Sequence, residues 1–262
     1  MGEVRAKKAL GQHFLTDMNI ARKIAEALDG GERDYPSDVL EVGCGTGVLT
    51  QFLLARPDIT LWGVEIDTES VAYLERHYPE FTPRLMCRDF LKMDLAAAFP
   101  HGLRVAGNFP YNISSQIFFK ILENRDIVPE CVGMIQREVA VRIAEPPGSR
   151  DYGILSVLLQ AWYDIEYLFT VNEGVFNPPP KVKSAVIRLR RNGVRRLDCD
   201  ERLFVKVVKA AFGQRRKMLR NALRAVFGDF SQEHPFFSRR AETLSVEEFT
   251  ELTRWVGEHA GQ

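Results

Sequence analysis

The segment Glu41-Val-Gly43-Cys-Gly45-Thr-Gly47 constrains the fold of this chain more than any other stretch. It follows an apolar run at residues 39–42 and precedes an amphipathic run at residues 48–54, so it predicts a strand, a glycine turn and the start of a helix. Because glycine has no Cβ atom, such a turn lets the backbone approach a ligand closely. A tight turn that binds no ligand is the alternative.

Glu65, which ends the apolar segment Leu61-Trp-Gly-Val-Glu65, indicates the kind of ligand. It lies 22 residues after Gly43, about the offset at which an acidic residue closing a second strand accepts hydrogen bonds from ribose hydroxyls. A dinucleotide-binding turn would have its third glycine at the position of Val48, whereas here it comes at Gly47. The spacing Glu-x-Gly-x-Gly-x-Gly resembles that of S-adenosylmethionine (AdoMet) methyltransferases, whose cofactor has no phosphate to be bound at a helix N-terminus.

The tetrapeptide Asn108-Phe-Pro-Tyr111 indicates the chemistry. It follows an apolar run at residues 103–106 and therefore belongs at the carboxyl end of a strand, where open α/β sheets bind ligands. The exocyclic amine of adenine is a weak nucleophile because its lone pair is delocalised into the ring. The Asn108 side-chain oxygen and a main-chain carbonyl freed by Pro110 can hold its N–H bonds out of the ring plane, while Tyr111 stacks on the flipped base. A turn with a buried tyrosine is the alternative.

Four longer stretches resemble the KsgA-type ribosomal RNA adenine dimethyltransferases, and the resemblance covers nearly the whole chain. They are Lys8-Ala-Leu-Gly-Gln-His-Phe-Leu15, Gly107-Asn-Phe-Pro-Tyr-Asn-Ile-Ser114, Gly174-Val-Phe-Asn-Pro-Pro-Pro-Lys-Val-Lys-Ser-Ala185 and Ala211-Phe-Gly-Gln-Arg-Arg-Lys-Met-Leu-Arg-Asn-Ala222. The resemblance implies that AdoMet is the methyl donor. It also implies that the N6 atoms of two adjacent adenines are methylated in a hairpin loop near the 3′ end of small-subunit rRNA, within an immature ribosomal subunit whose assembly the protein checks.

The same resemblance implies the site. The segment ending at Leu15 closes over the cofactor, and Asp89 accepts a hydrogen bond from the amino group of its adenine, unless that residue is simply a helix cap. Phe176 stacks on the target base opposite Tyr111. We therefore expect the cofactor-binding residues His13, Leu15, Gly43, Gly45, Glu65, Ile66, Asp89, Phe90 and Asn108, and the catalytic residues Asn108, Pro110, Tyr111 and Phe176.

The chain departs from the family pattern at three positions. His13 stands where many members have Asn, and both residues can donate a hydrogen bond. Cys44 stands where the family often has Pro, and Phe109 where it often has Leu. None of the three changes removes a group that the mechanism needs.

The charged residues are distributed unevenly, although the net charge is zero. Residues 174–197 hold seven Lys or Arg and no acid, and residues 202–224 hold eight and no acid, so that these two blocks contain 15 of the 35 basic residues. One-sided blocks of this kind are typical of phosphate binding and predict contact with RNA. A solvated helix face is the alternative, but such faces usually alternate Glu with Lys.

The order of apolar segments predicts the architecture. Strands at residues 39–42, 61–65, 84–87, 105–107 and 132–136 alternate with helices, which is typical of a parallel sheet, and residues 165–171 and 185–190 form a late hairpin joined by a loop at 176–181. We expect an α/β fold: a Rossmann-like AdoMet methyltransferase sheet with helices on both faces, plus a small all-helical C-terminal domain. The AdoMet-binding domain, with its basic N-terminal arm, spans residues 1–192. The helical RNA-docking domain spans residues 193–262.

Composition excludes several classes of protein. No stretch approaches the roughly 18 apolar residues of a membrane span, and the N-terminus is no signal peptide, so we expect a cytoplasmic protein without a membrane partner. The four cysteines and five histidines form no cluster with metal-ligand spacing, so we expect neither a metal site nor a disulfide framework. We expect a monomer.

Three other functions remain open. A methyltransferase of the erythromycin-resistance type would act on a large-subunit adenine, but the Pro-Pro-Pro-Lys loop and the Phe-Gly-Gln-Arg-Arg-Lys segment favour the KsgA type. A non-catalytic assembly factor is disfavoured by the intact Asn108 and Tyr111. An oxidoreductase is disfavoured by the glycine spacing.

Overall fold

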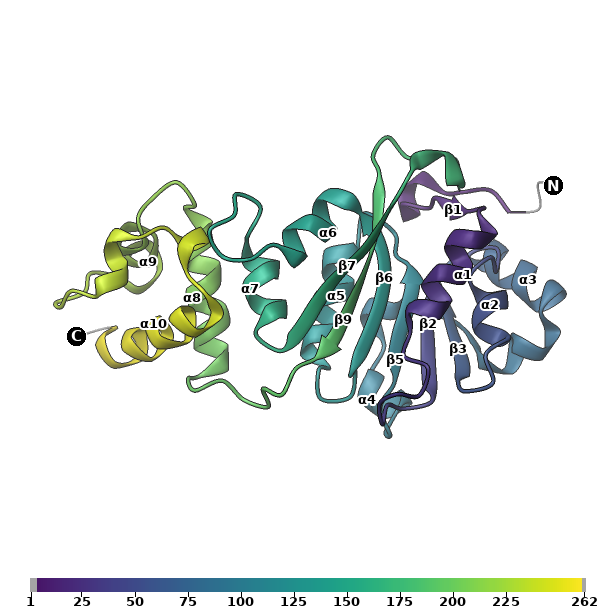
Figure 1. Ribbon diagram of the computed structural model, residues 1–262, viewed down its shortest axis with the longest axis horizontal. Helices are drawn as coiled ribbons and strands as arrows, with labels where there is room; N and C mark the ends of the chain where they lie inside the picture. Colours follow the sequence, from purple (N-terminus) through teal and green to yellow (C-terminus); the bar gives the residue numbers. More distant parts are fainter. Residues whose placement is uncertain (1–3, 261–262) are drawn as a thin grey trace. The chain divides into compact units, whose positions relative to one another are not determined.

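The computed structural model describes residues 4–260. Within them the central feature is a seven-stranded sheet with the strand order β4-β3-β2-β5-β6-β9-β7 (Figure 1). The strands are β2 Asp38–Val42, β3 Thr60–Glu65, β4 Leu85–Cys87, β5 Arg104–Asn108, β6 Glu130–Gln136, β7 Tyr163–Val171 and β9 Ser184–Arg191. Strands β2 to β6 pair in parallel, and β9 runs antiparallel to β6. Each predicted strand is present, and β7 and β9 are neighbours, as expected for a hairpin.

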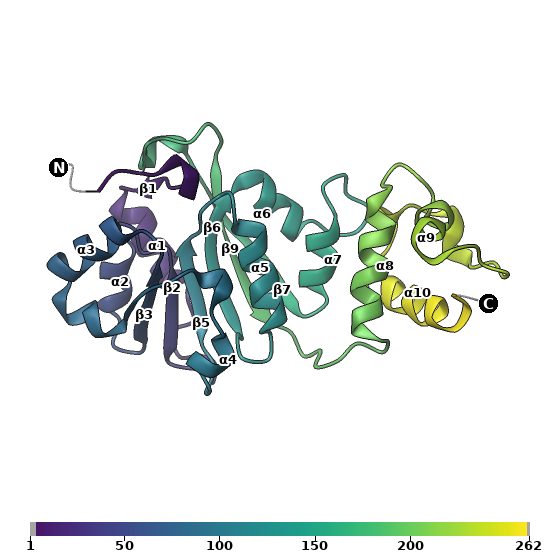
Figure 2. The same ribbon diagram turned by 180° about the vertical axis from the view of Figure 1, so that it is seen from behind.

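The central strands are buried along nearly their whole length. Their sequences are almost continuous apolar runs rather than alternating ones, because a parallel sheet is covered by helices on both faces. Helix α1 lies over one face of the sheet, and α5 lies over the other, as Figures 1 and 2 show from opposite sides. The helices are α1 Met18–Ala27, α2 Thr50–Leu54, α3 Thr68–His77, α4 Leu95–Ala98, α5 Ser114–Glu123, α6 Arg137–Ala144, α7 Ile154–Gln160, α8 Glu201–Gly213, α9 Leu219–Phe227 and α10 Val246–His259.

Local signals set the helix ends. Asp17 caps α1: its carboxylate accepts hydrogen bonds from the backbone N–H groups of Asn19 and Ile20 at 2.8 and 3.0 Å. At α10 the residues Ser245 and Glu248 form the reciprocal capping box that their spacing predicts, with N···O distances of 3.2 and 2.9 Å.

A two-stranded ribbon joins the N-terminal segment to the loop before β9. Strand β1 Phe14–Leu15 pairs antiparallel with β8 Phe176–Asn177, and Leu15 lies opposite Phe176. Both of these side chains are buried in the apolar core beside the sheet. The start of the predicted loop at residues 176–181 is therefore a strand. Two-residue strands carry no periodicity, so no sequence pattern marks them.

The chain divides into two compact units. One extends to Ala140 and includes Ile165–Arg191; the other comprises Val141–Asp164 and the chain from Asn192 onward. The chain passes from the first unit to the second for the last time between Arg191 and Asn192, one residue before the predicted boundary at 192/193. The segment Val141–Asp164, which we expected in the first domain, groups instead with the C-terminal helices.

Aromatic contacts explain that grouping. Trp162 packs edge-on against Phe204 of α8, with 6.0 Å between ring centroids, and Tyr152 packs against Phe212 at 6.3 Å. Phe204 and the other apolar residues that repeat along one face of α8 form the core of this unit; those fully buried are Phe204, Val207, Val208 and Ala211.

Candidate active site

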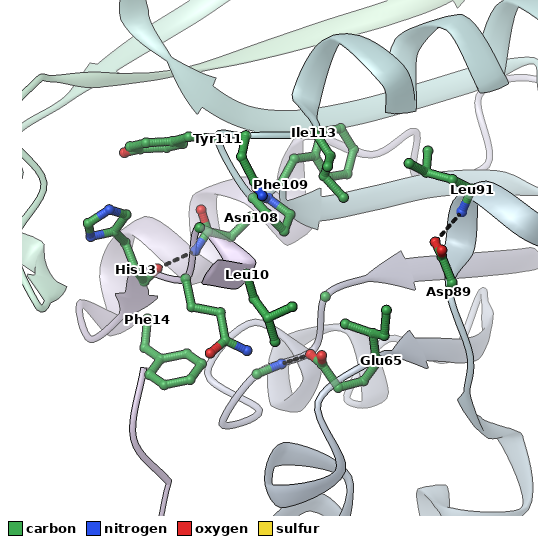
Figure 3. A pocket seen from close by; sticks show the side chains of 17 residues that line it. Leu10, His13, Phe14, Glu65, Asp89, Leu91, Asn108, Phe109, Tyr111 and Ile113 are labelled. Carbon is green, nitrogen blue, oxygen red and sulfur yellow. Dashed lines mark hydrogen bonds between the residues drawn. The ribbon is translucent and has the colours of Figure 1, made fainter. Parts of the chain in front are cut away.

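A cavity opens at the carboxyl edge of the sheet, where β2, β3, β4 and β5 end (Figure 3). Parallel strands end at the same edge, so residues far apart in the sequence meet there. The cavity is lined by residues 10–14 of the N-terminal segment, Gly43, Gly45, Glu65, Ile66, Asp89, Leu91 and residues 108–113. It therefore brings together most of the predicted site residues: His13, Gly43, Gly45, Glu65, Ile66, Asp89, Asn108, Pro110 and Tyr111.

The glycine turn after β2 adopts a backbone that other residues rarely adopt. Gly43 and Gly45 have φ angles of +78° and +54°. A Cβ atom on Gly45 would lie 3.0 Å from the Phe14 ring, so glycine allows that ring to pack against the turn. At Gly43 and Gly45 the turn therefore lines the cavity with backbone atoms and no side chain.

Glu65, at the end of β3, is oriented by two backbone hydrogen bonds. Its Oε2 atom accepts from the Gly45 N–H and its Oε1 atom from the Asp67 N–H, both at 2.9 Å. The side chain is buried, and burial raises its pKa above the usual value, although the two N–H bonds act in the opposite direction. Each oxygen keeps a second lone pair that can accept a ribose hydroxyl, so the carboxylate fits the predicted role.

Asp89 follows β4 and lies across the cavity from His13 and Phe14 (Figure 3). Its Oδ1 atom accepts the Leu91 N–H at 3.0 Å, so it caps a short 3-10 helix, Phe90–Lys92. It is thus a cap and also lines the cavity. Leu91 and the half-exposed Ile66 supply apolar surface next to it.

The N-terminal segment is tied to the rim of the cavity. Lys7 forms ion pairs with Asp67 and, at 3.1 Å, with Glu69, and Gln12 donates to Asp67 at 3.4 Å. Further along, the His13 Nδ1 atom lies 2.8 Å from the Pro178 carbonyl oxygen, and the ribbon of β1 with β8 begins at the next residue. These contacts hold the segment beside the glycine turn.

Asn108 closes β5 with a defined amide orientation. Its Nδ2 atom donates to the His13 carbonyl oxygen at 2.9 Å (Figure 3). A carbonyl oxygen only accepts, so the amide must turn its NH₂ group toward His13, which leaves Oδ1 as an acceptor. The neighbouring Pro110 carbonyl accepts the Ile113 N–H at 3.2 Å and has a second lone pair. Asn108 and Pro110, which both line the cavity, therefore each keep an acceptor that the N–H bonds of an amine could use.

Tyr111 is half-buried, and burial raises the pKa of its hydroxyl. That hydroxyl forms a hydrogen bond with the Ser184 Oγ atom of β9. Its ring lies 5.2 Å from the His13 imidazole, with a tilt of 32° between the planes. The tyrosine is thus a neutral aromatic ring at the edge of the cavity.

Three predicted site residues do not line the cavity. Phe90 is only 4% exposed, and Phe176, also 4% exposed, is enclosed with Leu15 of β1 in the apolar core. Leu15 is 5% exposed and lies behind Gly43, beside a space of about 30 Å³ that Phe14 and Asn108 also line. Stacking of Phe176 on a base would require the ribbon to open.

The sequence prediction missed Leu10, Phe14, Leu91 and Ile113, which form apolar walls of the cavity. No sequence pattern identified Phe14, because its strand has only two residues and shows no alternation that could be detected.

Glu41 is a buried carboxyl group within β2. It is 1% exposed, and its Oε2 atom accepts a hydrogen bond from the Thr50 hydroxyl at 2.7 Å. Burial, with a smaller contribution from the charge of Glu65, raises the pKa of Glu41 to about 8. This acid is therefore largely neutral at pH 7 and joins the strand to α2.

The structure also bears on metal binding and membrane insertion. Across residues 4–260, no three His, Cys, Asp or Glu side chains come together in a group that could hold a metal ion. None of the helices in that range has the length and apolar character needed to cross a bilayer.

Two arginines of the first block, residues 174–197, have acidic partners from elsewhere in the chain. Arg188 contacts Glu166 at 2.6 Å and donates to the Ala27 carbonyl at 3.0 Å. Arg190 lies 3.3 Å from the fully buried Glu130. These two ion pairs join β9 to its neighbouring strands β7 and β6.

In the second block, residues 202–224, some cations bind other groups of the protein and others are exposed. The Arg215 guanidinium donates to the carbonyls of Arg150 and Tyr152, and Arg220 and Arg224 pair with Glu233 and Asp229 at the surface. The exposed cations include Arg202, Lys206, Lys209, Arg216 and Lys217. Three of them, Arg202, Lys206 and Lys209, rim a groove between α8 and α9 that no acid lines.

Known proteins resemble the chain over almost its whole length. A family model described as ribosomal RNA adenine dimethylase matches residues 3–256. Relatives named ribosomal RNA small subunit methyltransferase A, from Parabacteroides distasonis and Bacteroides thetaiotaomicron, are each 56% identical. The alignments cover 95% and 97% of this chain and 93% and 95% of those proteins.

Solved structures agree with the fold. A dimethyladenosine transferase from Plasmodium falciparum superposes with a TM-score of 0.74 at 23% identity, covering 95% of this chain and all of that one. The 23S rRNA methyltransferase ErmE has a TM-score of 0.65 at 25% identity, covering 91% and 99%. Together with the AdoMet-type glycine turn, the acid at the end of β3 and the Asn-Phe-Pro-Tyr segment at the cavity, these matches establish that the chain belongs to the AdoMet-dependent ribosomal RNA adenine dimethylase family.

Proposed function

We propose that the protein methylates the N6 atoms of two adjacent adenines in a hairpin loop near the 3′ end of small-subunit rRNA, within an immature subunit. The names of its 56%-identical relatives support the small subunit as the source of the RNA. One observation carries the chemistry at nitrogen. Asn108 uses its NH₂ group on the His13 carbonyl, so that its oxygen is available to an amine beside the Pro110 carbonyl.

The proposed cofactor contacts follow from the cavity. Glu65 accepts the ribose hydroxyls, Asp89 accepts the adenine amino group, and Ile66 and Leu91 cover the faces of the adenine. AdoMet supplies an electrophilic methyl group on a positively charged sulfur. Gly43 and Gly45 line the cavity, and their positive φ angles, which glycine adopts without strain, let the turn offer its backbone to this cofactor.

The protein's groups promote the reaction by holding the target amine in place rather than by removing a proton from it. Asn108 Oδ1 and the Pro110 carbonyl accept its two N–H bonds and stabilise the positive charge that develops on nitrogen during methyl transfer. Tyr111, a neutral phenol whose pKa burial raises further, stacks on the flipped base. The proton then leaves to water, so the site needs no strong base.

Methylation of purified subunits tests the proposal. The protein is incubated with labelled AdoMet and, in parallel, with immature small subunits, mature small subunits or large subunits, and the labelled adenines are mapped. We expect label at two adjacent adenines of the immature small subunit. Label confined to the large subunit would contradict the proposed target and favour the erythromycin-resistance type.

We propose further that the C-terminal unit docks the RNA through exposed cations of the second block. Reversing the charges of Arg216 and Lys217 to Glu should lower affinity for small-subunit RNA and reduce the slope of log affinity against log salt by about 1 to 2, because each phosphate contact adds roughly 0.7 to 0.9 to that slope. AdoMet affinity should be retained. Arg215 is left unchanged because its guanidinium binds two backbone carbonyls, and its loss would disturb folding.

A matched control reverses Arg22 and Lys23, two adjacent exposed cations on α1. This control makes the same change in net charge outside both basic blocks, and its salt slope should equal that of the parent. Equal slopes for the Arg216/Lys217 variant and the parent would remove these two residues from the RNA contact.

We infer that the protein acts as a monomer in the cytoplasm, where ribosomal subunits are assembled. We infer also that catalysis and docking are divided as the sequence predicted, with the methyl-transfer site on the N-terminal part and docking on the helical part. The cavity supports this division, because every residue that lines it belongs to the unit that contains the sheet.

A further inference from the structure

We propose that Ser184 is a positioning residue for methyl transfer, which holds Tyr111 in the orientation that stacks on the target base. Ser184 is the first residue of β9 and is fully buried. Its Oγ atom forms a hydrogen bond with the Tyr111 hydroxyl, 73 positions away in the chain. The inference rests on the proposed role of Tyr111.

The sheet fixes the position of Ser184. Ser184 lies opposite Gln136 in the pairing of β9 with β6, and the next hydrogen bond runs from the Arg137 N–H to the Lys183 carbonyl at 2.9 Å. Strand β6 also pairs with β5, where Met134 lies opposite Asn108. Asn108, which holds the amine, and Ser184, which anchors Tyr111, are therefore both positioned by pairing with the same strand, β6.

The hydrogen bond restricts one particular motion of the ring. A tyrosine hydroxyl lies on the Cβ–Cγ axis, so a bond at that end fixes where the axis points but does not stop rotation about it. The His13 ring, 5.2 Å away, limits the rotation. A ring held in this way loses little freedom when a base stacks on it, which favours the reactive geometry. Because Phe176 is buried, the orientation of Tyr111 matters more to the bound base.

Three variants test the proposal: Ser184→Ala, Tyr111→Phe and the double variant. Each single variant removes the same hydrogen bond, so each should lower kcat by roughly three- to ten-fold, the range for one such bond, with the KM for RNA and the AdoMet dissociation constant unchanged. The double variant should be no slower than the slower single variant, because the two side chains act through one bond. Ser184→Thr, which keeps the hydroxyl, should recover part of the rate.

Two controls separate the possible failures. Ser156→Ala removes a buried hydroxyl from the other structural unit and should leave kcat unchanged. Tyr111→Ala tests the underlying role: parent activity there would remove Tyr111 from the mechanism, and the inference with it. If Tyr111→Ala is impaired, two results would overturn the inference alone: a parent-like kcat for Ser184→Ala, or the same fold loss from Ser184→Ala in the Tyr111→Phe background as in the parent.

Discussion

The variant Asn108→Ala should methylate small-subunit RNA about 10² to 10³ times more slowly than the parent protein, the range for loss of one electrostatic stabiliser in an active site. The variant lacks the oxygen that accepts an N–H bond of the target amine. The effect lies in the transition state, so AdoMet and RNA affinity should stay within a few fold. Single-turnover methylation measures the rate, and calorimetry measures the two affinities.

Asn124→Ala is the matched control for this variant. Asn124 is half-buried, and its amide likewise donates to a backbone carbonyl, that of Lys120, at 2.9 Å. Its loss should leave the methylation rate unchanged. Full activity of Asn108→Ala would contradict the mechanism and would favour an assembly factor that binds RNA without needing this site. The parent rate should also show no pH step from a catalytic base, because neither Asn108 nor Pro110 titrates.

The variant Glu65→Ala should weaken AdoMet binding by roughly 10- to 150-fold, which corresponds to the loss of about 1.5 to 3 kcal/mol of charge-assisted hydrogen bonding to ribose hydroxyls. Isothermal titration calorimetry measures the dissociation constant. An unchanged value would remove Glu65 from the cofactor site.

Two further variants separate ribose binding from turn stability. Glu65 also accepts the N–H groups of Gly45 and Asp67, so the alanine variant loosens the glycine turn as well as losing the cofactor contact. Glu65→Gln keeps the volume and one acceptor oxygen, and it should lose less affinity than the alanine variant. Glu75→Ala, an exposed acid on α3, should bind AdoMet as the parent does.

Local patterns were sufficient for the sheet and for much of the cavity. Each predicted strand is a largely apolar run, and the parallel order follows from helices placed between strands. Once β2, β3, β4 and β5 are parallel neighbours, the residues after their carboxyl ends meet. That is why Gly43, Glu65 and Asn108 could be expected at one edge of the sheet, whereas Asp89, which also lines the cavity, was expected there from the family resemblance.

The direction of individual side chains could not be predicted in the same way. Leu15 and Phe176 belong to strands of two residues each. These strands are far apart in the sequence, and their pairing places both side chains in the core. Phe90 is turned inward in the short helix that Asp89 caps, which leaves Leu91 at the cavity. In the two short strands a one-residue change of register exchanges the buried side chain with its neighbour, and no local periodicity sets that register.

The basic blocks show most clearly what each level determines. The amino-acid sequence sets how much positive charge the chain carries in residues 174–197 and 202–224, and it places no acid within either block. Folding decides which of these charges remain exposed: Arg188 and Arg190 pair with Glu166 and Glu130, whereas Arg216 and Lys217 are exposed. The energy between two charges depends on their separation in space, and for residues that are far apart in the chain this separation is set by folding.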